Sequence, residues 1–150
     1  MIMNISKNFV IQELIPPDLY DYIGDNLNRF YRYIDPRLVE LLQEIREHFK
    51  KPMTVNTWHY GGSFNYRGWR PFDYYKDSPN RSNLRVSQHQ MGRAVDFTVK
   101  GLDSDDVRSE LLIMNDKGKF KHLGALEDSV SWVHADIRHR PNGEVLLFQP

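Results

Sequence analysis

The sequence contains no cysteine, so it excludes both disulfide bonds and thiolate metal sites. Any transition metal must therefore be held by histidine and carboxylate side chains. Net charge is also absent, because 20 basic residues balance 20 acidic ones. This balance supplies no general electrostatic attraction to nucleic acid or to an anionic membrane surface, so neither is expected as a partner.

Long hydrophobic runs are missing as well. No stretch approaches the ~20 apolar residues that a membrane-spanning helix needs, so membrane insertion is not expected. Residues 1–10 show no basic start followed by an apolar segment, so no signal peptide is expected. The sequence predicts a product made in the cytoplasm, which another component must release if its substrate lies outside the membrane.

What is present is the composition of a globular protein, with 40% hydrophobic and 27% charged residues. A chain of 150 residues fits one domain that buries about two-thirds of its unfolded surface. No internal repeat or linker divides it. We expect a single domain over residues 1–150, with residues 1–34 as an N-terminal extension packed on it.

Two helices have clear start signals. The first is predicted at residues 36–49, where Asp35 is an N-cap, Pro36 occupies the first position and apolar residues recur at helical spacing. The second follows an N-cap at Asp103 or Ser104 and has an acidic first turn. Near the N-terminus we expect an extended segment at 9–14, a short helix at 18–22 and a loop at 24–28.

Strands are predicted where residue types alternate or where short apolar runs occur. The turn signal Pro141-Asn142-Gly143 predicts a hairpin whose return strand comes next. Residues 71–85 are polar and predict a long surface loop. The expected strands cover residues 53–58, 95–99, 131–138 and 144–148.

Two imidazoles and one carboxylate form a candidate metal set. His89 and Asp96 lie seven residues apart, on either side of a glycine turn, and His134 lies in a later strand. Catalytic zinc typically takes three protein ligands and leaves a fourth position open. Glu127 and Asp128 are the nearest carboxylates that could accept a proton beside such a site.

Residues 59–70 mix glycines and aromatics with two arginines. This composition fits either a flexible connection or a wall of the site. As a wall, Arg67 or Arg70 would hold an anionic substrate group, because the planar guanidinium suits carboxylates. His59 would then face the substrate. Asp136, on the same strand face as His134, would orient a ligand from behind it.

The pattern Ser87-x-His89-x-x-Gly92-x-Ala94-x-Asp96, followed by Trp132-x-His134, resembles the signature of the M15 family of zinc peptidases. The resemblance covers residues 35–149. It implies one zinc ion held by the two histidines and the aspartate. It also implies a hedgehog/DD-peptidase-like fold of the α+β class, with helices packed on a small antiparallel sheet that carries the metal.

The same resemblance implies an activity. Members are D,D-carboxypeptidases, or endopeptidases that cut L-Ala-D-Glu bonds, so the expected partner is the peptidoglycan stem peptide. Residues 56–70 resemble the loop of phage and prophage members. An endolysin-like product that is phage-encoded and released to the cell wall is therefore one expectation, and a phage, prophage or bacterial origin stays open. Ser87 would lie on the substrate side, Trp132 would support the ligands, and Arg67 or Arg70 would hold the substrate carboxylate.

One position departs from the family pattern. Many members carry the catalytic acid three residues before the last histidine ligand, where this chain has Ser131. Asp128, six residues before His134, matches the acid of the hedgehog branch and is the expected catalytic residue, with Glu127 as the fallback. The alternative is a zinc-containing binding module for the cell wall or a virion, with weak or lost catalysis.

Overall fold

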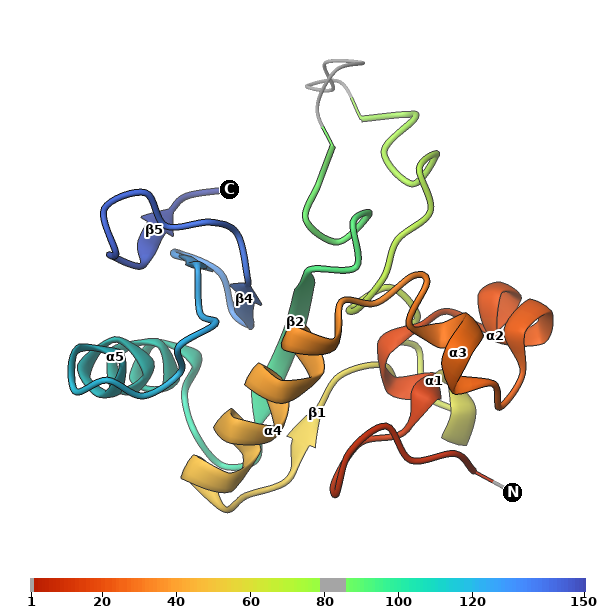
Figure 1. The fold of residues 1–150 in the computed structure, drawn as a ribbon, viewed down its shortest axis with the longest axis horizontal. Helices are drawn as coiled ribbons and strands as arrows, with labels where there is room; N and C mark the ends of the chain where they lie inside the picture. The colour runs from red at the N-terminus through yellow and green to blue at the C-terminus, as the bar shows by residue number, and fades with distance from the viewer. Residues whose placement is uncertain (1, 79–85) are drawn as a thin grey trace.

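The structure is a computed structural model that describes residues 2–78 and 86–150. It is an α+β fold in which helices surround a five-stranded sheet (Figure 1). The helices are α1 (Ile11–Leu14), α2 (Pro17–Ile23), α3 (Leu27–Phe30), α4 (Pro36–Phe49) and α5 (Ser104–Asp116), with a short 3-10 helix η1 (Trp58–Tyr60). The strands are β1 (Met53–Thr54), β2 (Ala94–Val99), β3 (Ala125–Glu127), β4 (Val133–Asp136) and β5 (Leu146–Phe148).

The two long helices start as predicted. The Asp35 carboxylate accepts a hydrogen bond from the Arg37 amide at the start of α4, and Asp103 does the same for Asp105 at the start of α5. Such caps satisfy backbone N–H groups that have no partner within the helix. Both helices pack against β2, which they support from one face of the sheet (Figure 1).

The sheet order is β1-β2-β4-β3-β5. Every neighbouring pair is antiparallel except β3 and β5, which run parallel. The expectation of a purely antiparallel sheet was therefore wrong at one edge. The turn at 141–143 does form, with the Gly143 amide 3.1 Å from the Arg140 carbonyl oxygen, but it does not lead into a hairpin. Because β2 and β3 already occupy both edges of β4, the final strand cannot pair with β4 and pairs with β3 instead.

Three predictions of local structure were also wrong. Residues 11–14 form α1 rather than an extended segment, and α3 begins at Leu27, within the loop expected at residues 24–28. The strand predicted at 53–58 ends at Thr54, and Trp58 begins η1 instead. The part of the 71–85 loop that is described, residues 71–78, consists of turns, and residues 79–85 lie outside the described residues.

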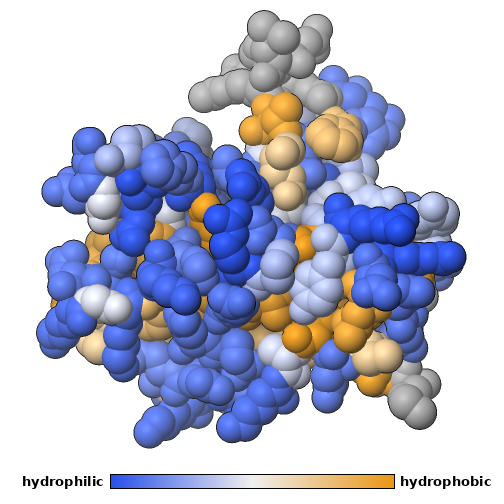
Figure 2. Space-filling view, in the orientation of Figure 1, coloured by the Kyte–Doolittle hydropathy of each residue, from blue (hydrophilic) through white to orange (hydrophobic). Residues whose placement is uncertain are grey.

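Residues near the N-terminus are part of the main core. Phe9, Ile11 and Leu14 are almost fully buried in the same hydrophobic cluster as the residues of α4 and β2. The surface seen in Figure 2 is mainly hydrophilic, with apolar residues in separate small patches. Among the described residues, no helix has the length and apolar character needed to cross a membrane.

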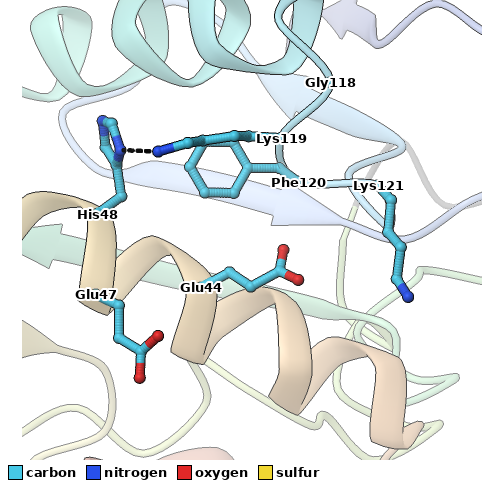
Figure 3. A pocket seen from close by; sticks show the side chains of 7 residues that line it. All are labelled: Glu44, Glu47, His48, Gly118, Lys119, Phe120 and Lys121. Carbon is cyan, nitrogen blue, oxygen red and sulfur yellow. Dashed lines mark hydrogen bonds between the residues drawn. The ribbon is translucent and has the colours of Figure 1, made fainter.

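A cavity of about 350 Å³ lies between α4 and the turn after α5, away from the predicted metal ligands (Figure 3). Glu44 points into it from α4, and one oxygen of its carboxylate is buried without a hydrogen-bond partner among the described residues. His48 joins the two helices through a 2.8 Å contact with Glu110. Lys119 lies 3.5 Å from the other ring nitrogen of His48.

Two glycines let the chain pass close to other backbone segments. A Cβ atom on Gly68 would lie 2.2 Å from the Leu14 carbonyl oxygen, and one on Gly92 would lie 1.7 Å from the Tyr33 carbonyl oxygen. The Gly92 carbonyl also accepts a hydrogen bond from the Asp35 amide at the start of α4. Gly92 lies in the turn between two predicted metal ligands, His89 and Asp96. This contact therefore fixes that turn against the start of α4.

Replacing Gly92 with alanine should destabilise the fold more than the same change at Gly101. Both glycines have positive φ, +66° and +75°, so an alanine at either site is strained by about 1–3 kcal/mol. Only Gly92 also meets backbone atoms, whereas Gly101 has nothing within 4 Å. Urea denaturation of both variants measures the difference. Equal losses of unfolding free energy would show that the close approach does not matter.

Glu13 should make stability depend on pH. Burial raises its pKa from 4.5 to about 6, against the opposing hydrogen bond from the Val10 amide. A raised folded pKa gives stability that is complete below pH 4.5 and is lost as the pH rises through 6. A shift of this size corresponds to about 2 kcal/mol. Denaturation at pH 4.5 and 6.5 should show this loss in the wild type but not in Glu13→Gln; parallel pH profiles would contradict it.

Candidate metal centre

The predicted ligands come together on one face of the sheet. In the antiparallel pair of β2 and β4, Asp96 lies opposite His134. The register of β3 with β4, which pairs Leu126 with Ala135, continues so that Glu127 comes opposite His134 on its other side. Phe148 of β5 pairs with Glu127. Because paired residues of neighbouring strands share a face, these four side chains form a row across four strands.

Three donor atoms converge at the centre of the site. His134 Nδ1 lies 2.9 Å from Asp96 Oδ1, and His89 Nε2 lies 3.2 Å from each of these atoms. All three residues are buried. Ligands of a tetrahedral zinc ion, with bonds of about 2.0–2.1 Å, are separated by about 3.3 Å. The spacing of the donor atoms therefore fits one metal ion of this size.

The hydrogen bonds on the outer side of each ring determine which nitrogen faces the centre of the site. His89 Nδ1 lies 2.7 Å from the Gly68 carbonyl oxygen, and His134 Nε2 lies 3.2 Å from Asp136 Oδ2. Both oxygens only accept, so these two nitrogens carry the ring protons. In the neutral rings, the inner nitrogens then present lone pairs to each other and to the Asp96 carboxylate. Three acceptors this close need either a proton or a metal ion between them.

The pKa values reflect this arrangement in the absence of metal. Burial alone would lower the pKa of His134, but Asp136 and Asp96 outweigh it and raise the pKa to about 9. His134 and His89 hold the pKa of Asp96 well below its usual range, against the effect of its burial. His89 keeps a lowered pKa because it is the most deeply buried of the three.

Arg70 and Arg67 have different positions. The Arg70 guanidinium donates to Asp96 Oδ2 at 2.7 Å, to the Tyr66 carbonyl oxygen at 2.8 Å and to the Tyr75 hydroxyl at 2.6 Å. It therefore holds the carboxylate so that its other oxygen faces the histidines. Arg67 instead stacks over the Phe64 ring at 3.6 Å. Its Nη1 donates to the Thr54 carbonyl oxygen at 3.5 Å. Of the two arginines proposed to bind substrate, Arg67 is the one that does not bond a predicted metal ligand.

An open cleft surrounds the donor atoms in two adjoining parts. The larger part, about 720 Å³, contains the metal ligands, and the smaller part, about 320 Å³, contains Arg67. Arg70, Asp96 and Trp132 line both. Other residues that line the larger part include Ser87, Glu127, Arg138 and Phe148.

Glu127 and Asp128 are adjacent in the chain, but only Glu127 faces the cleft. Glu127 lies in the row beside His134 and lines the larger part of the cleft, whereas Asp128 does not line it. Successive side chains of a strand point to opposite faces, which accounts for the difference. Burial raises the pKa of Glu127, with a smaller opposing effect from His134. The fallback residue of the sequence analysis therefore has the geometry expected of the acid, although its role remains a prediction.

The remaining predicted residues have supporting positions. The Ser87 hydroxyl accepts a hydrogen bond from the His89 amide at 3.2 Å, so it shapes the metal turn. Trp132 lines the cleft, and its carbonyl accepts from the buried Arg108 of α5 at 2.6 Å. His59 packs its ring against Trp58 and Tyr60 and lines neither part of the cleft.

Sequence reasoning missed two residues of the site. Arg138 pairs with Asp136 and lies over the Phe148 ring at 4.7 Å. Arg138 had a signal in the sequence, namely the two-residue spacing of His134, Asp136 and Arg138. For Phe148, which packs edge-on against His134 at 5.5 Å, no signal existed because the parallel pairing of β5 is not encoded locally.

Comparison with known proteins adds no relative, since no family model, curated protein or solved structure matches the chain. Among the described residues, His89, Asp96 and His134 are the one group of three or more potential ligands whose donor atoms lie within 4.8 Å of one another. The structure therefore defines a buried site able to hold a metal ion in a small α+β protein.

Protein purified without chelators should contain one zinc ion per chain. His134→Ala should abolish tight binding, because two ligands remain. Asp136→Asn should weaken it about 10–100-fold, as is usual when the partner behind a histidine ligand is changed. The exposed His139 provides the control, since His139→Ala removes a histidine outside the site. Elemental analysis and competition with a chelating dye measure occupancy and affinity. A wild type that refuses added zinc would contradict the assignment.

Proposed function

We propose that the chain is a zinc-dependent peptidase that hydrolyses peptide bonds of peptidoglycan and adopts a hedgehog/DD-peptidase-like fold. The observation that carries the proposal is the position of Glu127 beside three convergent donor atoms in an open cleft. The sequence signature around His89 and His134 supports the same class of reaction.

The metal would be held by His89 Nε2, His134 Nδ1 and Asp96 Oδ1. When bound, zinc polarises the scissile carbonyl and activates water for attack. The Gly68 carbonyl and Asp136 fix the histidine rings, and Arg70 fixes the carboxylate. These contacts hold all three ligands in place before substrate arrives.

Glu127 performs the proton transfers in this proposal. Its carboxylate takes a proton from the attacking water and returns it to the nitrogen of the leaving amine. Burial raises the pKa of Glu127, which brings the carboxylate nearer to the range in which it can both accept and donate a proton at neutral pH. Arg138 and Phe148 bound the same part of the cleft and limit the approach of bulk water.

The smaller part of the cleft binds the substrate carboxylate. Burial lowers the pKa of Arg67, while the nearby Asp96 raises it, so its charge is partly desolvated and unopposed by a direct ion pair. An arginine of this kind suits a carboxylate of the peptide. Phe64, Tyr74 and Trp132 supply the apolar walls. This arrangement fits both a D,D-carboxypeptidase and an L-Ala-D-Glu endopeptidase.

One observation favours a second candidate, a zinc-containing binding module for the cell wall or a virion. Ser131, in the position where many M15 peptidases carry the acid, is exposed and cannot act as a base at neutral pH. In such a module the zinc would keep the fold, and the cleft would recognise peptide without cutting it.

Glu127→Gln should keep zinc but lose at least ~10²-fold of peptidase activity, because it removes the proton acceptor without changing the shape of the side chain. Asp128→Asn is the matched control one residue away and should keep both. The assay follows new amino termini released from purified peptidoglycan. Loss only in Asp128→Asn would move the role to that residue, and zinc without cleavage in the wild type would favour the binding module.

A further inference from the structure

A third pocket adjoins the cleft on the side of α2. It measures about 250 Å³, and four aromatic side chains line it: Tyr22, Tyr33, Tyr66 and Trp69. One carboxylate, Asp18, also lines it. Neither the metal site nor the proposed proton transfers use any of these side chains.

The walls of this aromatic pocket come from three separate segments. Asp18 and Tyr22 are four residues apart on α2, so they share one helix face. Tyr33 follows α3, and its ring stands nearly perpendicular to Trp69 of the long loop, with centroids 5.5 Å apart. The pocket therefore forms only when these segments come together in the folded chain. The rings of Tyr33 and Trp69 meet at nearly a right angle.

Two of its side chains are open to solvent and so accessible to a ligand. Tyr22 is 68% exposed. The Asp18 carboxylate is exposed, and it makes no hydrogen bond or ion pair with any residue in the described parts of the chain. A ligand that combines apolar faces with hydroxyl donors would satisfy both groups at once.

The aromatic pocket and the substrate cleft are neighbours. Tyr66 lines both this pocket and the part of the cleft that contains Arg67. The Tyr66 carbonyl also accepts the hydrogen bond from Arg70 that helps to hold Asp96. A long substrate bound at the metal would reach the aromatic pocket by passing over Tyr66.

A sugar ring has the chemistry that this pocket requires. Its C–H faces pack on aromatic rings, and its hydroxyl groups donate to a carboxylate. A purely apolar peptide segment would instead leave Asp18 and the tyrosine hydroxyls without partners on burial, which costs about 1–3 kcal/mol for each group. The peptides of the proposed substrate are attached to a chain of N-acetylated amino sugars.

We propose that the aromatic pocket is a subsite for one N-acetylated amino-sugar ring of the glycan that carries the substrate peptide. The inference rests on the proposed peptidase function for the identity of the glycan. It predicts that the protein prefers peptides still attached to sugar over free peptides.

The first test needs no peptidase activity. Binding of tri-N-acetylchitotriose, a peptide-free oligomer, is measured by calorimetry. Wild type should bind, and Tyr22→Ala and Asp18→Asn should each weaken binding about three- to tenfold, since one aromatic contact or one hydrogen bond is worth about 1 kcal/mol. Tyr60, an aromatic residue that is 65% exposed outside the pocket, is the control, and Tyr60→Ala should bind normally.

A second measurement links the subsite to catalysis. Tyr22→Ala should raise KM for glycan-linked peptide, while its kcat and its KM for free stem peptide stay at wild-type values. Sugar binding that is weakened in Tyr22→Ala and unchanged in Tyr60→Ala supports the subsite even if no peptide is cleaved, in which case the peptidase proposal alone fails. Wild type that binds no sugar, or that binds a proline-rich peptide in its place, overturns the subsite.

Discussion

The structure depends on three electron-pair donors that face each other within 3.2 Å. In the absence of metal, a proton on His134, whose pKa is raised to about 9, joins its ring to the Asp96 carboxylate. A metal ion at the same place could take all three atoms as ligands. The surrounding residues hold them in place: Gly68, Asp136 and Arg70 each contact one of the three from behind. Buried polar groups that are all paired in this way specify one geometry, whereas an incomplete network would destabilise the core.

The sheet supplies the precision that this arrangement needs. Paired strands place Asp96, His134 and Glu127 side by side, so their relative positions follow from the hydrogen bonds of the ladder and not from flexible loops. The opposite face of the same strands carries Val95, Val133 and Ala135, which are completely buried in the core. Disturbing the core would therefore move the site as well, since each strand contributes to both.

Sequence reasoning found the residues whose signals are local. Asp35, Pro36 and Asp103 marked helix starts, and the alternation of residues 131–138 put Trp132, His134 and Asp136 on one face of a strand. It ranked Asp128 above Glu127 because chain offset was the available guide, whereas strand register places Glu127 in the cleft. The role of Arg70 depends on its contact with Asp96, 26 residues away. The packing of Phe148 depends on His134, 14 residues away, and β5 pairs with β3 across 21 residues. Such contacts are set by tertiary competition for strand edges, which no local pattern encodes.

Residues 68–70 contact the metal centre on one side and the aromatic pocket on the other. Its Gly68 carbonyl orients His89, its Arg70 orients Asp96, and its Trp69 ring forms a wall of the aromatic pocket. Under the two proposals, metal affinity and glycan affinity would therefore be linked through one stretch of backbone. Linkage is reciprocal, so a ligand of the aromatic pocket that orders this stretch would tighten a bound metal ion by the same factor by which the metal ion tightens the ligand. The proposed glycan would then act as a sensor of metal loading, and metal loading as a sensor of the glycan.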